Sequence, residues 1–319
     1  SLNIPLVMAQ SPVRGPDSAP GQRGLPDRLQ DHVLVLTGKA RQYKNLSAMN
    51  ATADYIRNQF TEIGLVVSEQ KFVVSGREYR NVIGRLDSRR PGQKIVVGAH
   101  YDVCGDQPGA DDNASGVASL IEIARSIAGA RTNLHHTVEF VGYALEVPPF
   151  FRTTDMGSYH HASGLSTGNT DLVYMLCLES IGYFTDDPGS QKYPFELMKL
   201  LYPDKGNFIA VVGDTNSADI VQAVRTSIRN NSRIDSQSLI APASIITGLD
   251  FSDHLNYWQF GYKAVMVTDT AFYRNTRYHT AADKPATLNY QSMAEVVKGL
   301  VPLLLSSTVT NQTSRYRSN

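Results

Sequence analysis

The chain has 319 residues, of which 42% are hydrophobic and 19% are charged, an ordinary balance for a globular protein. Its 30 basic and 30 acidic residues leave no formal net charge. Binding to nucleic acid or to an anionic membrane needs a basic surplus, so we expect neither partner. No run of 18 apolar residues occurs, which predicts no membrane span. Two cysteines exclude a scaffold built on disulfides.

The first 30 residues are predicted to be an extended leader, because residues 11–27 are rich in proline, glycine and serine. The apolar stretch 2–9 has two interpretations: the tail of a signal peptide, or a disordered or edge-packed N-terminus. We expect a secreted or periplasmic protein. Residues 31–319 show no internal repeat and no further linker, which predicts a single domain.

From residue 47 onward, strand-like and helix-like segments alternate. Apolar residues spaced by three and four predict a helix over 47–63, which Ser47 can cap and Gly64 can end. The alternation predicts a three-layer α/β/α sandwich with a mixed, largely parallel central sheet. Strands are expected at 65–74, 79–86, 94–99, 137–145, 172–178, 208–212 and 264–268, and further helices at 114–127, 217–228 and 290–304.

Polar residues follow directly after three of the predicted strands. His100 and Asp102 come after the strand at 94–99, and Glu146 and Glu179 come after two later strands. Ligands of such folds bind beyond the carboxyl ends of the strands, and imidazole and carboxylate groups are zinc ligands. Each residue alone is more often structural, but their joint placement favours a metal site. Asp102 lies two residues beyond His100 on the same side, where it can accept the other imidazole N–H.

Six motifs, in this order, resemble those of the M28 metallopeptidases. They are GAHYD (98–102), PGADDNASGVA (108–118), the strand end at Glu146 followed by Met-Gly-Ser (156–158), LES-IGY (178–183), SDH (252–254) and YHT (278–280). The resemblance covers residues 32–305, and the PGADDNASG block is close to diagnostic. It implies the zinc-exopeptidase fold and an aminopeptidase that removes N-terminal residues of peptides through a metal-activated water.

The resemblance also implies a role for each matched ligand position. Two zinc ions would lie about 3.5–4 Å apart, as in other two-metal sites. Asp112 would bridge both ions, and His100 and Glu179 would complete the first site. His279 would serve the second site.

The same resemblance assigns the catalytic groups. Glu146 would be the general base, and the hydroxyl of Tyr278 would stabilise the oxyanion. Asp253 is expected to orient groups behind the ligands, as Asp102 does. Two prolines cannot continue a central strand, so Phe150 and Phe151 are expected to leave it and line the substrate pocket. The alternative is that both aromatic residues pack under a loop.

One position departs from the family pattern. The family usually has two consecutive glutamates where this chain has Glu146 and Val147, and the following Pro-Pro-Phe-Phe sets the register. Valine cannot coordinate a metal, so the second site keeps only Asp112 and His279, too few for the usual tetrahedral zinc. In the alternative register, Glu146 is the ligand and Leu145 replaces the base. We expect one firmly bound zinc and a second site that is weak or empty.

Three functions are compatible with these features. The first is an aminopeptidase acting on peptides, which the retained Glu146 and the other ligands favour. The second is an impaired pseudopeptidase or binding protein that keeps the fold and one zinc. The third is a glutaminyl cyclase, a relative with a single zinc, whose ligand aligned with Val147 is missing here. The sequence indicates neither the preferred side chain nor the oligomeric state.

Overall fold

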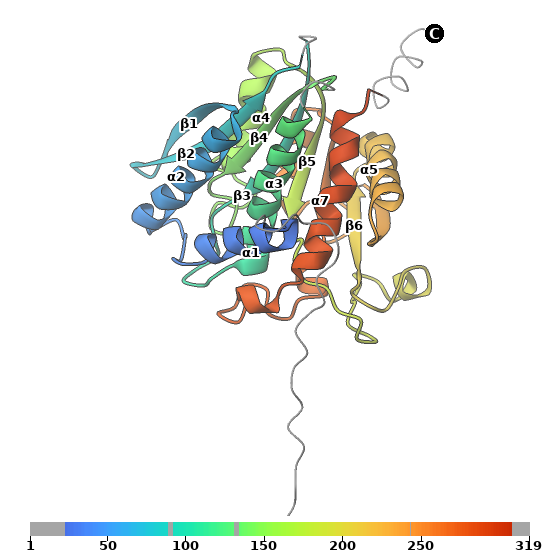
Figure 1. The fold of residues 1–319 in the computed structure, drawn as a ribbon. Coiled ribbons are helices and arrows are strands. Elements are labelled where there is room, and N and C mark those ends of the chain that lie inside the picture. Colours follow the sequence, from blue (N-terminus) through green and yellow to red (C-terminus); the bar gives the residue numbers. More distant parts are fainter. Residues whose placement is uncertain (1–22, 89–91, 131–133, 243, 308–319) are drawn as a thin grey trace, which may run out of the picture.

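A computed structural model describes residues 23–88, 92–130, 134–242 and 244–307. These residues form an eight-stranded sheet in the order β1-β2-β4-β3-β5-β8-β6-β7, between two layers of helices (Figure 1). Parallel pairing joins β3 to β4 and β5, β5 to β8, and β6 to β7, whereas the other pairs are antiparallel. The predicted three-layer fold with a mixed sheet is confirmed. The strands are β1 (Val66–Val74), β2 (Arg77–Leu86), β3 (Gln93–His100), β4 (Thr137–Tyr143), β5 (Asp171–Glu179), β6 (Phe208–Gly213), β7 (Asp235–Ile240) and β8 (Ala264–Thr268).

Helices cover both faces of the sheet. One face carries α1 (Leu25–Leu36), α2 (Leu46–Ile63), α3 (Gly116–Gly129), α5 (Ala218–Asn231) and α7 (Tyr290–Leu305), which Figure 1 shows side by side. The other face carries α4 (Gly157–Thr167) and α6 (His254–Gln259). Short helical turns are η1 (Ala110–Ser115), η3 (Glu196–Leu200), η4 (Thr215–Ser217), η5 (Ala271–Tyr273) and η6 (Pro285–Thr287). Within the described residues, no helix has both the length and the apolar character that crossing a membrane requires.

Several elements differ from the sequence predictions, among them α1 and β7. Residues 25–30, expected to be extended, form the first turns of α1, whose Leu29 and Val33 are fully buried. Pro26 fits the first turn because a proline lacks only an N–H that needs no partner there. The remainder of the expected leader, residues 1–22, lies outside the described residues. Strand β7 was not predicted, because its sequence DSQSLI is polar and lies at the edge of the sheet.

The parallel central strands position the site. Because β3 pairs in parallel with both β4 and β5, the carboxyl ends of all three strands reach the same edge of the sheet. Strand β4 ends at Tyr143, two residues before the predicted end, and Leu145 has a left-handed backbone with φ of 62°. The chain therefore turns out of the sheet just before Glu146. His100 and Glu179 are the last residues of β3 and β5.

Candidate active site

Three side chains from this edge of the sheet converge into a buried cluster. His100 Nε2 lies 3.2 Å from Asp112 Oδ1 and 3.1 Å from Glu179 Oε2. Asp112 belongs to η1, the turn that leads into α3. One nitrogen or oxygen atom from each of the three residues lies within 4.8 Å of the other two. The structure therefore brings together the three residues predicted for the first zinc.

The chemistry of this cluster fits a bound cation. The buried carboxylates of Asp112 and Glu179 both contact the imidazole of His100, with the carboxylate of Glu146 nearby. Burial alone would lower the pKa of His100, but the charges of Glu179 and Glu146 hold that pKa well above its usual value. Buried carboxylates are normally paired or coordinate a metal, and a group with one imidazole and two carboxylates suits zinc.

Glu146 lies beside the cluster, with its Oε2 atom 3.7 Å from His100 Nε2. Its position depends on Asp102, whose two carboxylate oxygens accept the backbone N–H groups of Glu146 at 3.1 Å and of Val147 at 3.2 Å. Asp102 was predicted to accept an N–H of His100; His100 Nδ1 lies 3.4 Å from Asp102 Oδ1, close to it but without a hydrogen bond of normal geometry. Asp102 thus lies beside the imidazole and also closes the turn that presents Glu146.

The residues predicted for the second zinc lie on the other side of Asp112. His279 Nε2 is 2.8 Å from Asp112 Oδ2, and the ring of Tyr278 stacks on the ring of His279 at 3.9 Å. Burial raises the pKa of Tyr278 well above its usual range, so its hydroxyl keeps its proton and remains a donor. Val147 is buried, and its side chain has no atom that binds a metal.

The turn that carries Asp112 is held by side chains that the sequence analysis did not select. Asn113 donates to the carbonyl of Leu178 at 2.9 Å and accepts from the N–H of Ser180 at 3.1 Å, which ties the turn to both sides of Glu179. Asp283 accepts from the N–H of Asp112 at 3.2 Å. Asp283 lies four residues after His279, so its place near a predicted ligand was the available signal.

Arg41, which belongs to none of the six sequence motifs, holds the same turn. Its side chain is fully buried and donates four hydrogen bonds to backbone carbonyls. Two of them go to Pro108 and Gly109, at 2.7 and 2.8 Å, directly before η1. The others go to Leu36 and Tyr101. Nothing in the local sequence around Arg41 indicated this role.

The SDH motif supports Glu179 from behind. Ser252 Oγ donates to Glu179 Oε2 at 2.8 Å. Asp253, predicted to orient groups behind the ligands, is fully buried, and burial raises its pKa to about 7 although the charge of His100 opposes this. Within this motif, the hydrogen bond to the predicted metal ligand Glu179 therefore comes from Ser252, which was not predicted to have this role.

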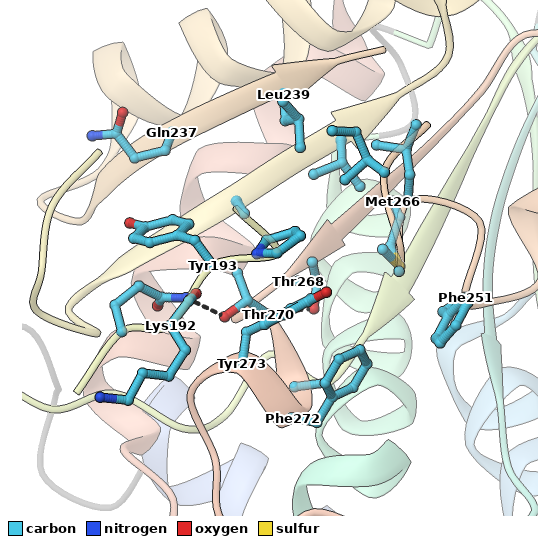
Figure 2. A pocket seen from close by; sticks show the side chains of 18 of the residues that line it. Lys192, Tyr193, Gln237, Leu239, Phe251, Met266, Thr268, Thr270, Phe272 and Tyr273 are labelled. Atoms are coloured by element: carbon cyan, nitrogen blue, oxygen red, sulfur yellow. Dashed lines mark hydrogen bonds between the residues drawn. The ribbon is translucent and has the colours of Figure 1, made fainter. Parts of the chain in front are cut away.

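An apolar cavity of about 100 Å³ adjoins the cluster, and both Glu179 and Tyr278 line it. Figure 2 shows aromatic and aliphatic side chains around it, including those of Tyr193, Leu239, Phe251, Met266 and Phe272. A concave apolar site with a few polar groups at one end is typical of a binding pocket for a small molecule or side chain.

Phe150 and Phe151, predicted to line the pocket, are not among the residues around this cavity. Phe150 packs edge-on against Tyr43, with ring centroids 5.0 Å apart. Phe151 contacts Phe251 with centroids 5.6 Å apart, and Phe251 lines the cavity. Phe151 therefore lies behind the cavity wall, whereas Phe150 faces a different part of the core.

A buried imidazole and carboxylates at the carboxyl edge of a mixed sheet, beside a further carboxylate and an apolar cavity, are typical of metal-dependent hydrolases. The sequence profile of peptidase family M28 matches residues 81–304. The chain is 41% identical to the protein YfbL of Escherichia coli (strain K12) over 316 residues, 95% of each chain. The chain belongs to peptidase family M28, and at the level of this family it is a zinc exopeptidase that hydrolyses peptide bonds.

More distant proteins agree with this assignment. Leucine aminopeptidase 1 of Sclerotinia sclerotiorum is 22% identical, over 91% of this chain and 76% of the relative. The LapA aminopeptidase of Legionella pneumophila superimposes with a TM-score of 0.71 at 19% sequence identity, covering 88% of this chain and 71% of that chain. At this identity the superposition shows a shared fold.

Proposed function

We propose that this protein is an aminopeptidase that removes large apolar N-terminal residues from peptides. One observation carries the proposal: Glu179 belongs both to the metal cluster and to the wall of the apolar cavity, and Tyr278, which stacks on His279, lines the same cavity. A residue whose side chain fills the cavity would have its own carbonyl beside the cluster. The cavity has room for about one large side chain, and the leucine aminopeptidases among the relatives support an apolar preference.

The residues of the cluster divide the chemistry between them. A zinc ion held by His100, Asp112 and Glu179 would lower the pKa of a water molecule and polarise the scissile carbonyl. Glu146 Oε2, 3.7 Å from His100 Nε2, takes a proton from the attacking water and gives it to the leaving amine. The hydroxyl of Tyr278, at the mouth of the cavity, donates to the oxygen on which negative charge develops.

The proposal includes a single firmly bound zinc. His100, Asp112 and Glu179 offer one imidazole and two carboxylates, which leaves a fourth position open as in other catalytic zinc sites. On the other side of Asp112, His279 is the remaining matched ligand, and Val147 contributes none. Without the second carboxylate, less negative charge offsets the repulsion between two dications.

The test uses the purified full chain, elemental analysis and a matched set of substrates. We expect about one zinc per chain, hydrolysis of leucine and phenylalanine amides, and no hydrolysis of their N-acetylated forms. A binding protein would hold zinc and hydrolyse none of these amides. A glutaminyl cyclase would instead convert an N-terminal glutamine without releasing it. Either of these results would overturn the proposal.

A further inference from the structure

A second buried arginine, Arg274, contacts segments that form the walls of the apolar cavity. It is 4% exposed, and its Nε donates to Gln191 Oε1 at 2.8 Å. Its Nη1 donates to the carbonyl of Tyr183 at 3.2 Å. Both acceptors are neutral, whereas the negative charges that act on Arg274 are those of Asp269 and Asp111. Arg274 itself does not line the cavity.

The guanidinium of Arg274 is also enclosed by aromatic rings and by a glycine. It lies 4.7 Å from the ring centroid of Phe208 and 5.6 Å from that of Phe184, within the range of cation–π contacts. A Cβ atom on Gly206 would lie only 2.6 Å from Arg274 Cδ. The chain passes so close to the arginine that residue 206 has no room for a side chain.

These contacts reach the first part, the middle and the last part of one long connection. The segment between β5 and β6 leaves the sheet after Glu179 and returns at Phe208. Arg274 binds Tyr183 and Phe184 near its start, Gln191 in its middle, and Gly206 and Phe208 at its end. The middle of this connection, residues 191–202, forms one wall of the cavity, with Tyr193, Pro194, Met198 and Tyr202.

Arg274 is also joined through the backbone to the opposite wall. It directly follows η5, whose Ala271, Phe272 and Tyr273 line the cavity. Two further hydrogen bonds join the walls beside it: Gln191 Nε2 to Thr270 Oγ1 at 2.8 Å, where Figure 2 draws a bond to Thr270, and Lys192 N–H to the Tyr273 carbonyl at 2.7 Å. Moving Arg274 would therefore move the two walls relative to each other.

We infer that Arg274 is a positioning residue for specificity: it sets the separation between residues 191–202 and η5, and thereby selects the size of the apolar side chain that the cavity accepts. The inference rests on the proposed function, because it assigns the cavity to the N-terminal side chain of the substrate. An apolar pocket discriminates by about 10-fold or more for one methylene group, so small changes in wall separation should be measurable.

Two variants test this without touching a residue that lines the cavity. Arg274→Lys keeps the charge but loses the forked hydrogen bonds and the flat stacking surface. Gly206→Ala keeps Arg274 and pushes it with a methyl group. Arg277→Lys is the matched control, because Arg277 lies in the same loop and donates to the hydroxyl of Tyr183, not to the cavity walls. Zinc content is measured for each protein.

We expect both test variants to change the ratio of kcat/KM between leucine and phenylalanine amides by about 10-fold, with zinc content unchanged, and the control to keep the ratio. Calorimetric binding of free leucine and phenylalanine gives the same ratio when turnover is absent, so failure of the proposed function leaves this test intact. Ratios within twofold of the unaltered protein in both folded variants, or an equal change in the Arg277→Lys control, would overturn the inference.

Discussion

The turn that holds the metal ligands and the wall that shapes the cavity are both irregular segments, and each is held by one buried arginine. Burial lowers the pKa of both Arg41 and Arg274 to about 10, so both stay charged at neutral pH. Arg41 donates four bonds to backbone carbonyls, and residues 109–116 around Asp112 are all buried.

The cavity wall is held less completely. No residue between Lys192 and Tyr202 is buried, and Leu197 and Leu200 are 68% and 81% exposed. The metal turn is therefore fully buried and is held by hydrogen bonds of Arg41, Asn113 and Asp283, whereas the wall depends on contacts at a few points. Catalytic groups need a fixed geometry, while binding segments usually lie on less stable parts of a fold. The comparison predicts that substitutions near the metal turn will change zinc binding and activity. Substitutions near the cavity wall will instead change the substrate preference.

The largest effect is expected at the metal cluster itself. Glu146→Gln should lower kcat by about 100- to 10,000-fold, because the amide cannot take a proton from water. Zinc content should remain unchanged, since Glu146 lies outside the group of ligand atoms within 4.8 Å of one another. Steady-state kinetics and elemental analysis measure the two quantities. Glu122→Gln, a buried glutamate on α3, is the control and should leave kcat unchanged in the folded protein. Loss of zinc in Glu146→Gln would instead make Glu146 a ligand.

Arg41→Met is expected to affect the metal turn without affecting the cavity wall. The variant leaves four backbone carbonyls, three of them in buried hydrogen bonds, without their donor and loosens the turn before Asp112, so zinc affinity should fall by about 10- to 100-fold. The preference between leucine and phenylalanine should not change, because Arg41 contacts no cavity wall. Competition with a chelator measures the affinity. A change in preference without a change in zinc affinity would contradict the division between the regions.

Val147→Glu tests the ligand count on the far side of Asp112. The new carboxylate should raise the zinc content from about one to about two per chain and increase peptidase activity, because it restores a charged ligand beside His279. Val147→Gln has nearly the same size without the charge and serves as the control. If the unaltered protein already carries two tightly bound zinc ions, another residue fills the position or the register at Val147 differs.

The smallest effects are expected behind the cavity wall. Phe151→Ala removes the ring that supports Phe251, so it should change the leucine-to-phenylalanine preference by about threefold, below the effect of one methylene in a tight pocket. Phe150→Ala should lower stability by about 2 kcal/mol and keep the preference, since its partner is Tyr43. Thermal unfolding and kcat/KM ratios distinguish the two. An unchanged preference in Phe151→Ala would show that its ring does not support the wall.

The sequence was sufficient for seven of the eight strands and for the groups at the carboxyl edge of the sheet. Apolar runs predicted the central strands, and their shared direction explains why His100 and Glu179 meet. The anchoring roles of Arg41 and Arg274 could not be predicted from the sequence. A hydrogen bond between residues far apart in the chain leaves no pattern in the sequence near either partner. Arg41 reaches carbonyls 60 and 68 residues away, and Arg274 reaches a side chain 83 residues away.

The close approach of Gly206 to Arg274 has a consequence for how the two positions vary among relatives and in designed libraries. As long as an arginine occupies position 274, a side chain at 206 meets it at 2.6 Å, so substitutions at 206 alone should be eliminated. Replacing Arg274 by a smaller residue frees the space and makes alanine or serine acceptable at 206. The two positions should therefore covary. A library that randomises both together would sample cavity shapes that single substitutions cannot reach.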